Sequence, residues 1–287
     1  MCESCDIADT PHPSAPGAPT AFDLRGEHGS MAELLRDLRR SWPLLRVLAK
    51  KEFLVRFRRA TFGVVWALAL PLLQACVLAL VLPKFVRFDV EGSYVLFVLA
   101  GSTVWSFFAT AIADGTASIV AAQDISTRVY FPRLVLPMVV VLANLYALLP
   151  GVAVLAGATI VDHGLTVRIL WLGPAVALAT LLVASLAAVL SALHVYFRDV
   201  RYFVQASLIA WFYLTPVIYP LDAIGGLRPW IELNPVTGVV ELFRAGTVGI
   251  EGAWLTSVAW SAGWSAVLLV VGLMVHHRRD RVFVDLL

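Results

Sequence analysis

The chain has 287 residues, of which 60% are hydrophobic and only 15% are charged, and its mean hydropathy is +0.82. These proportions exclude a water-soluble globular domain and predict an integral membrane protein. The net charge of +2 hides an uneven distribution of basic residues along the chain, and we expect no nucleic-acid partner.

Residues 1–29 are rich in proline and show no regular apolar pattern, so we expect a disordered cytoplasmic tail. This segment also lacks the basic start and the apolar run of a secretory signal. Cys2 and Cys5 have the spacing of half a zinc site, but the only other cysteine is Cys76, and His12 alone cannot complete a tetrahedral site. We therefore expect no bound metal ion.

Residues 30–60 are predicted to form an amphipathic interface helix region. Ser30 and Glu33 make a capping box, after which arginines and apolar residues occupy different helix faces. The apolar face carries Leu34, Leu35, Leu38, Trp42, Leu45 and Leu48. We expect Pro43 to divide the helix into two pieces. The pattern favours a position in the membrane interface, and a solvated helix packed on a partner is the alternative.

Residues 61–281 are predicted to form the transmembrane domain. Its first span, residues 61–82, contains no Asp, Glu, Lys or Arg and is long enough to cross a hydrocarbon core of about 30 Å. Five more apolar segments bring the prediction to six transmembrane helices; they are residues 94–113, 134–161, 169–196, 202–219 and 254–275. The expected fold class is an all-α integral membrane protein.

Two segments between these spans have a different character. Residues 114–133 are too polar to cross the membrane and are predicted to form a short cytoplasmic helix. Residues 221–253 contain short apolar runs interrupted by Gly and Pro, which predicts a re-entrant helical hairpin on the outer side, between spans five and six. With this topology 17 Lys and Arg residues lie inside and five outside, so the positive-inside rule places both termini in the cytoplasm.

Recognisable catalytic chemistry is missing from the sequence. The chain has three lysines and no Gly-Lys pair, so it lacks the glycine-rich loop that holds the phosphates of ATP, and we expect neither a catalytic residue nor a cofactor in this chain. Asp114, His163, His194 and Asp199 lie near span ends and are interpreted as boundary residues in contact with water or lipid headgroups. The spans carry almost no charge, which argues against an ion-coupled carrier.

Aromatic residues are numerous within the spans, away from their ends. They are Trp66, Trp105, Phe107, Phe108, Trp211, Phe212 and Tyr213. One interpretation is that these rings face lipid or pack in the core. The functional alternative is a channel lining on which the C–H faces of sugar rings stack, so that a long polymer slides without fixed hydrogen bonds.

Five short motifs occur in order at the predicted membrane boundaries. They are Arg56-Phe-Arg-Arg-Ala-Thr-Phe-Gly63 with Trp66 and Pro71, Tyr130-Phe-Pro-Arg133 with Pro137, Phe197-Arg-Asp-Val200, Leu214-Thr-Pro-Val217, and Asn234-Pro235 followed by Arg244. Over residues 42–281 the chain resembles permeases of the ABC-2 type, in particular the branch that exports polysaccharides and polyol phosphates such as O-antigen, teichoic acid and galactan. It departs from that pattern at Thr61-Phe62, where the family usually has serine and leucine.

The resemblance implies a homodimer in the bacterial cytoplasmic (inner) membrane that exports a lipid-linked polymer. Two copies of a separate ATPase subunit would bind ATP and Mg and drive export. The candidates for coupling to this subunit are Gln123, Asp124, Arg128, Tyr130 and Arg133. The candidates for the substrate entrance are Arg56, Arg58 and Arg59. The candidates for structural roles within the motifs are Gly63, Arg198, Asp199, Asn234, Pro235 and Arg244.

Three other functions stay open on the sequence. A drug or small-lipid efflux permease of the same superfamily would share the topology. A membrane-embedded lipid or glycosyl transferase would need acidic or histidine residues clustered at one membrane level, and the sequence does not show such a cluster. The third is a passive scaffold for membrane assembly.

Overall fold

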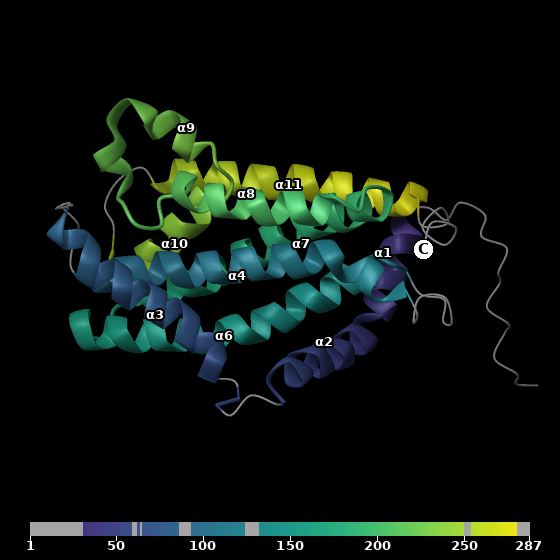
Figure 1. Ribbon diagram of the computed structural model, residues 1–287, viewed down its shortest axis with the longest axis horizontal. Coiled ribbons are helices and arrows are strands. Elements are labelled where there is room, and N and C mark those ends of the chain that lie inside the picture. The colour runs from purple at the N-terminus through teal and green to yellow at the C-terminus, as the bar shows by residue number, and fades with distance from the viewer. Residues whose placement is uncertain are drawn as a thin grey trace, which may run out of the picture.

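The computed structural model describes residues 31–58, 62–63, 65–85, 93–123, 132–249 and 254–279. Within these ranges the regular elements are all helices. The longer helices lie roughly side by side along the long axis of the molecule (Figure 1). The predicted tail, residues 1–29, lies outside the described residues, as do Arg59, Asp124, Arg128 and Tyr130.

Five helical segments in the described part of the chain are long and apolar enough to cross a membrane. They are α3 (Val65–Val81) with η1 (Leu82–Lys84), α4 (Tyr94–Ala121), α6 (Val135–His163), α7 (Leu172–Tyr196) with the preceding η2 (Val167–Trp171), and α11 (Trp254–Arg279). The chain is therefore a multi-pass membrane protein with an all-α fold, as the sequence predicted.

The predicted span at residues 202–219 differs from the structure. The helix there, α8 (Val200–Leu214), has 15 residues, which at 1.5 Å per residue extend about 22 Å, less than the roughly 30 Å of a hydrocarbon core. It ends at Leu214 because Pro216 has no N–H to continue the helix and forces the preceding residue out of the helical region; Thr215 has φ −102° and ψ 135°. The count of six spans accordingly stays a prediction.

The helix that contains the predicted span 94–113 is longer than that span. The helix α4 continues through Asp114 to Ala121, so the first part of the expected cytoplasmic helix belongs to α4. The sequence argument treated Asp114 as too polar for this position. In the structure its carboxylate is partly exposed and is paired with the guanidinium of Arg56 at 2.6 Å, so a charge at this position of the helix is not left without a partner.

The N-terminal amphipathic region forms two helices, α1 (Met31–Arg40) and α2 (Trp42–Phe57). Pro43 stands in the first turn of α2, where a proline N–H is not needed, so the expected division is confirmed. Leu45 and Ala49 of α2 are buried against Val135 and Val139 of α6, while Trp42 is half exposed. The apolar stripe therefore packs at least partly on the helical bundle.

Residues 221–249 form three short helices: η3 (Leu221–Leu227), α9 (Arg228–Glu232) and α10 (Thr237–Thr247). Every residue of α10 is buried. At Gly238 an added Cβ atom would lie 2.1 Å from the carbonyl oxygen of Ser257, so glycine allows α10 to approach α11 closely. These short helices fit the broken pattern of the sequence, and the re-entrant hairpin itself stays a prediction.

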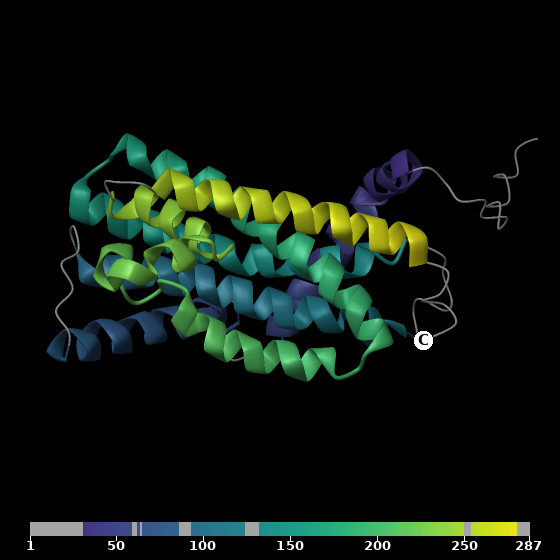
Figure 2. The same cartoon turned by 90° about the horizontal axis from the view of Figure 1, so that it is seen from above.

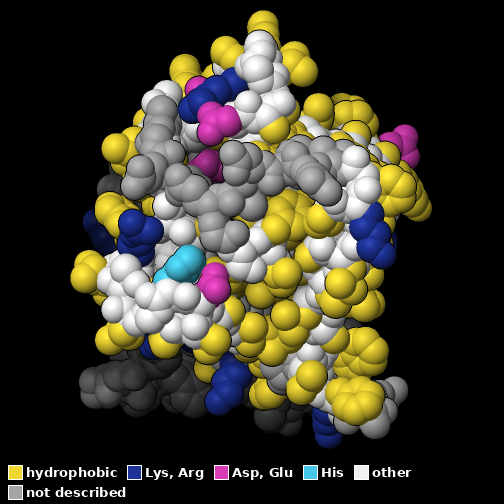
Figure 3. All heavy atoms as spheres, turned by 90° about the vertical axis from the view of Figure 1, so that its left-hand side faces the viewer, with side chains coloured by type: hydrophobic (Ala, Val, Ile, Leu, Met, Phe, Trp, Pro, Cys, Tyr) yellow, Lys and Arg dark blue, Asp and Glu magenta, His cyan; other side chains and the backbone are white. Residues whose placement is uncertain are grey.

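The two ends of the bundle carry different elements (Figures 1 and 2). One end, here called the α1 end, holds α1 and the C-terminal end of α11. The other end, called the α9 end, holds η3, α9 and α10. Figure 3 shows the α9 end with hydrophobic side chains over much of its surface and the charged side chains scattered between them.

Candidate functional site

A cleft of about 980 Å³ lies between α2, α3, α4, α6 and α8. Its wall is mostly apolar, with a few hydroxyl and amide groups such as Thr103, Ser106 and Gln74. The volume is in the upper part of the range for ligand pockets, which are typically about 300–1,000 Å³. The cleft is formed by helices that are distant in the sequence, so only the tertiary structure reveals it.

Five of the seven aromatic residues proposed as a channel lining line this cleft. They are Trp66, Trp105, Phe107, Phe212 and Tyr213. The rings of Trp105 and Phe212 pack edge to face with centroids 5.5 Å apart, and those of Phe212 and Tyr213 with centroids 5.2 Å apart. One wall thus presents a continuous aromatic surface from α4 to α8.

The other two aromatic residues lie behind this surface. Phe108 and Trp211 are not among the residues that line the cleft. Their rings pack edge to face at 5.3 Å, and Phe108 also contacts Trp105 at 5.5 Å. They support the lining residues from behind, and core packing, one of the two interpretations drawn from the sequence, describes their position.

Arg56, proposed as part of the substrate entrance, also lines the cleft. Its guanidinium donates hydrogen bonds to Asn144 Oδ1 at 2.9 Å and to Asp114 Oδ2 at 2.6 Å. The side chains of Arg56 and Asp114 are 30% and 40% exposed, so the ion pair is accessible, and Arg56 and Asn144 line the cleft while Asp114 does not. The structure thereby joins α2, α4 and α6 at one polar corner of an apolar cavity.

The sequence argument missed two members of this corner. Asp114 was interpreted as a boundary residue, and Asn144 was not considered. Asn144 stands alone in a long apolar segment, and its side-chain N–H₂ also donates to the carbonyl of Val140 at 3.0 Å. A lone amide in an apolar run is a signal that a buried partner exists, because an unpaired buried amide is costly.

Of the other proposed entrance residues, Arg58 is exposed just after α2, and Arg59 lies outside the described residues. Gly63 stands in the turn between α2 and α3 with φ +53°, a left-handed conformation that favours glycine. Among the proposed coupling residues, Gln123 is exposed at the end of α4 and Arg133 is buried beside the start of α6.

Arg198 and Asp199 form the exposed turn between α7 and α8. Asp199 precedes the first residue of α8, and its backbone carbonyl accepts a hydrogen bond from the N–H of Phe203 at 3.0 Å, while its side chain makes no capping bond. The structure thus places both residues in a turn, away from the cleft lining.

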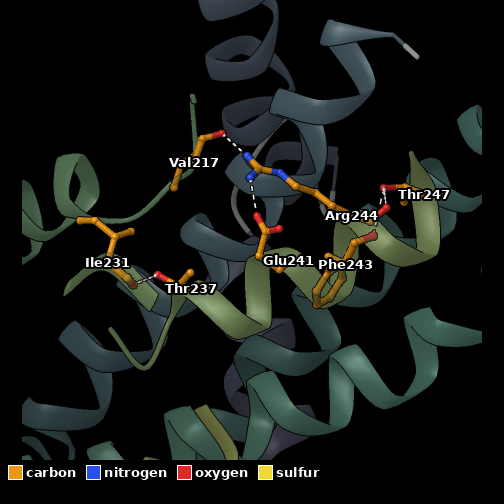
Figure 4. A network of polar contacts seen from close by, with 7 residues as sticks. All are labelled: Val217, Ile231, Thr237, Glu241, Phe243, Arg244 and Thr247. Carbon is orange, nitrogen blue, oxygen red and sulfur yellow. Dashed lines mark hydrogen bonds and ion pairs between the residues drawn. The ribbon is translucent and has the colours of Figure 1, made fainter. Parts of the chain in front are cut away.

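Asn234, Pro235 and Arg244 lie around the start of α10 and on α10 itself. Arg244 is fully buried. Its guanidinium donates to Glu241 Oε1 and to the carbonyl of Val217, both at 2.9 Å, as Figure 4 shows. Asn234 contacts the C-terminal end of α8 through Leu214 and Thr215. None of these residues lines the cleft.

At the α9 end, Arg228 holds η3 and α9 together. Its Nε donates to Glu232 at 2.7 Å, and Asp222 accepts a second hydrogen bond from the same guanidinium. The hydrogen bond to Glu232 raises the pKa of Arg228 above its ordinary value, so this cation stays charged at any physiological pH. The described residues contain no group of three His, Cys, Asp or Glu side chains that could hold a metal ion.

Comparison with known proteins gives consistent results. The family model described as ABC-2 type transporter matches residues 43–248. A curated relative, the O-antigen export system permease protein RfbA of Klebsiella pneumoniae, is 28% identical over 251 residues, which cover 85% of this chain and 95% of the relative. The protein of the same name from Myxococcus xanthus is 30% identical over 221 residues, covering 75% and 84% of the two chains. Because the family model spans most of the chain and the all-α, multi-pass fold agrees with it, this chain belongs to the ABC-2 type transporter family.

Proposed function

We propose that this chain is the membrane subunit of an ABC exporter that moves a lipid-linked polysaccharide or polyol-phosphate polymer across the bacterial cytoplasmic membrane. Two copies of the chain would form the permease, and two copies of a separate ATPase subunit would hydrolyse ATP. The observation that carries this proposal is the aromatic cleft with a cation at one corner. The curated relatives are named for O-antigen export, which supports a polysaccharide as substrate.

The chemistry of the cleft suits a long carbohydrate. Aromatic faces bind the C–H faces of sugar rings without a fixed set of hydrogen bonds, so successive sugar units can occupy the same surface in turn. A cleft lined mainly by directional polar groups would instead hold one unit and oppose sliding. The edge-to-face surface of Trp105, Phe212 and Tyr213 has the apolar character that sliding requires.

The polar corner suits the linkage between polymer and lipid. A phosphate or diphosphate is an anion, and a guanidinium binds phosphate oxygens with paired hydrogen bonds. In the present structure the guanidinium of Arg56 forms an ion pair with the carboxylate of Asp114. An entering phosphate would replace this carboxylate, with Asn144 keeping the guanidinium in place.

The proposed orientation follows from the positions of the basic residues. Most Lys and Arg residues belong to segments that flank the α1 end, so this end would face the cytoplasm and the α9 end the outside. The end of α4 and the start of α6 lie toward the α1 end (Figure 1), so the part of the chain that joins them, with Gln123, Asp124, Arg128, Tyr130 and Arg133, would contact the ATPase.

The first experiment is purification of the chain from its native host in mild detergent. We expect an ATPase subunit to copurify and its ATP hydrolysis in reconstituted vesicles to depend on this chain. Delivery of a lipid-linked polysaccharide into inverted vesicles would then identify the substrate. Isolation of the chain without an ATPase would overturn the proposal. Export of small apolar drugs in place of the polymer would support the efflux alternative.

A further inference from the structure

The end of α8 has backbone carbonyls that its own helix cannot satisfy. The last turn of any helix leaves C=O groups without intrahelical donors, and buried carbonyls need partners. After Leu214 the chain leaves the helical conformation at Thr215 and passes through Pro216, which has no N–H to offer. The residues from Leu214 to Ile218 therefore depend on donors from other elements.

Side chains from the start of α4, from α10 and from the residues before it supply these donors. Asn234 donates from Nδ2 to the carbonyl of Leu214 at 3.2 Å and to the hydroxyl of Thr215 at 3.0 Å. Arg244 donates to the carbonyl of Val217 at 2.9 Å, and the hydroxyl of Tyr94 donates to the carbonyl of Ile218 at 2.9 Å. Three side chains thus hold one broken helix end.

Asn234 also orients an aromatic side chain of α8. Its Oδ1 accepts hydrogen bonds from the indole N–H of Trp211 at 3.0 Å and from the backbone N–H of Val236 at 3.1 Å. Trp211 packs on Phe108 behind the cleft and precedes Phe212, which forms part of the cleft wall. The carboxamide therefore fixes both the backbone at the end of α8 and the ring behind the aromatic surface.

The buried position of Arg244 is energetically unfavourable for a charged side chain. Burying a guanidinium is unfavourable unless it is paired. Here Glu241 and the carbonyl of Val217 accept hydrogen bonds from its two terminal nitrogens, while its Nε is buried without a hydrogen-bond partner. The ring of Phe97 lies beneath it with the guanidinium carbon 3.5 Å from the ring centroid. These partners hold the guanidinium in position, so its hydrogen bond to the carbonyl of Val217 acts from a rigid support (Figure 4).

Along the rest of its length, α8 has little to hold it within one copy of the chain. Its buried residues are Val204 and Leu208 alone, while Tyr202, Phe203 and Ile209 are about 70% exposed. The position of the helix that carries Phe212 and Tyr213 is accordingly set mainly at its C-terminal end.

From this contrast we propose that Asn234 and Arg244, with Tyr94, form a clamp that makes α8 and α10 one unit and so positions the aromatic wall of the cleft. The two residues are positioning residues, because they act on the wall through the backbone of residues 214–218 and through Trp211. This inference rests on the proposed function for its role in transport, but the clamp itself is a property of the chain alone.

The test measures the position of α8 directly. Spin labels are attached at Phe203→Cys on α8 and Val267→Cys on α11, both exposed, after replacement of Cys2, Cys5 and Cys76 by serine. Labelled chain in nanodiscs is diluted with unlabelled chain, so that distances within one copy are measured. We expect a narrow distance distribution for the unmodified clamp and one about twice as wide for Asn234→Leu.

Milder variants keep the test valid if Asn234→Leu does not fold. Thr215→Val and Tyr94→Phe each remove one hydrogen bond of the clamp with little change in side-chain volume. Loss of a buried hydrogen-bond partner shifts the equilibrium between the clamped and released positions of α8 by about tenfold. The matched control is Thr247→Val, because the hydroxyl of Thr247 is buried but bonds only within α10, to Phe243 and Arg244. Equal widths of the distance distribution in all clamp variants and in the control would overturn the proposal.

A second readout separates positioning from folding in the assembled transporter. We expect Asn234→Leu to lower the polymer exported per ATP hydrolysed about tenfold, with ATP hydrolysis and protein yield within about twofold of wild type. A merely structural role would lower yield, hydrolysis and export together, and that outcome would contradict a positioning role. The distance measurement needs no polymer, so its result stands or fails independently of the proposed substrate.

Discussion

Arg56 belongs to α2, yet two other helices determine where its charge lies. Its hydrogen bonds to Asp114 and Asn144 join residues 58 and 88 positions away in the sequence. Because both members of the ion pair are partly exposed, the pair contributes at most about 1 kcal/mol to stability. In the proposed function, the guanidinium instead serves to bind a substrate phosphate in place of Asp114.

Substitution of Asp114 and substitution of Arg56 are predicted to change the affinity for substrate in opposite directions. Asp114→Asn frees the guanidinium and should lower the KM for a phosphate-linked polymer, while Arg56→Gln should raise it by about tenfold, as for the loss of a charged hydrogen bond. Export from reconstituted vesicles measures both. Asp162→Asn, an exposed acid near His163, is the control and should leave KM unchanged. A shift in the same direction for both variants would exclude the proposed role.

The aromatic wall gives a second prediction at the residue scale. Phe212→Leu keeps an apolar side chain but removes the ring that contacts Trp105 and Tyr213. Aromatic contacts contribute about 0.5–1.5 kcal/mol beyond their buried area, so export should fall roughly two- to twelvefold while ATP hydrolysis persists. Phe203→Leu is the matched control, since Phe203 is on the same helix, is 73% exposed and does not line the cleft. Equal export by Phe212→Leu and Phe203→Leu would show that the polymer does not move along the aromatic wall.

At the scale of elements, α10 is notable for how closely it approaches its neighbours. It is wholly buried although it is only 11 residues long. It contacts α11 closely at Gly238, and its Arg244 donates a hydrogen bond to the carbonyl of Val217. A helix this short gains little stability by itself. Its position therefore depends on close packing and on the buried pair of Glu241 and Arg244.

Gly238→Ala is predicted to destabilise the protein by about 1–3 kcal/mol, the usual cost of overpacking, because the new Cβ atom would lie 2.1 Å from a backbone carbonyl. The thermal midpoint in detergent should fall. Gly263→Ala on α11 is the matched control, since nothing lies within 4 Å of its added Cβ atom, and alanine in a helix should stabilise by up to about 1 kcal/mol. A midpoint lowered equally in both variants would show that close packing at Gly238 is not the cause.

At the scale of the whole molecule, both the first described helix and the end of the last lie at the α1 end (Figures 1 and 2). The proposed topology, with both of these ends in the cytoplasm, requires an even number of membrane crossings. Since five described helices are long enough to cross, that proposal assigns the remaining crossing to α8 together with the extended residues after it. The proposed topology therefore depends on a half-helix and not on a sixth full span.

Cysteine labelling tests this topology. In a background with Cys2, Cys5 and Cys76 replaced by serine, Trp230→Cys on the exposed surface of α9 should react with an impermeant maleimide in right-side-out vesicles. Arg278→Cys at the end of α11 should react only in inverted vesicles. Reaction of both sites from the same side would contradict the topology. Because both residues are exposed, a site that does not react lies on the opposite side of the membrane from the reagent and is not simply buried.

The sequence by itself determined the class of protein and most of its helices. Long apolar runs must form helices in a membrane, because every backbone polar group needs an internal partner there, and so α3, α6, α7 and α11 lie close to their predicted ranges. The break at Pro43 was equally predictable, because a proline acts locally on the backbone.

Only the tertiary structure decided the partner of Asp114, the contacts that hold the residues after α8 and the make-up of the cleft. Asp114 of α4 pairs with an arginine 58 residues away. The residues after α8 accept hydrogen bonds from Tyr94 of α4, from Asn234 and from Arg244 of α10. Five aromatic residues line the cleft while Phe108 and Trp211 pack behind it. Each of these outcomes depends on contacts between residues far apart in the sequence, and local periodicity carries no information about such contacts.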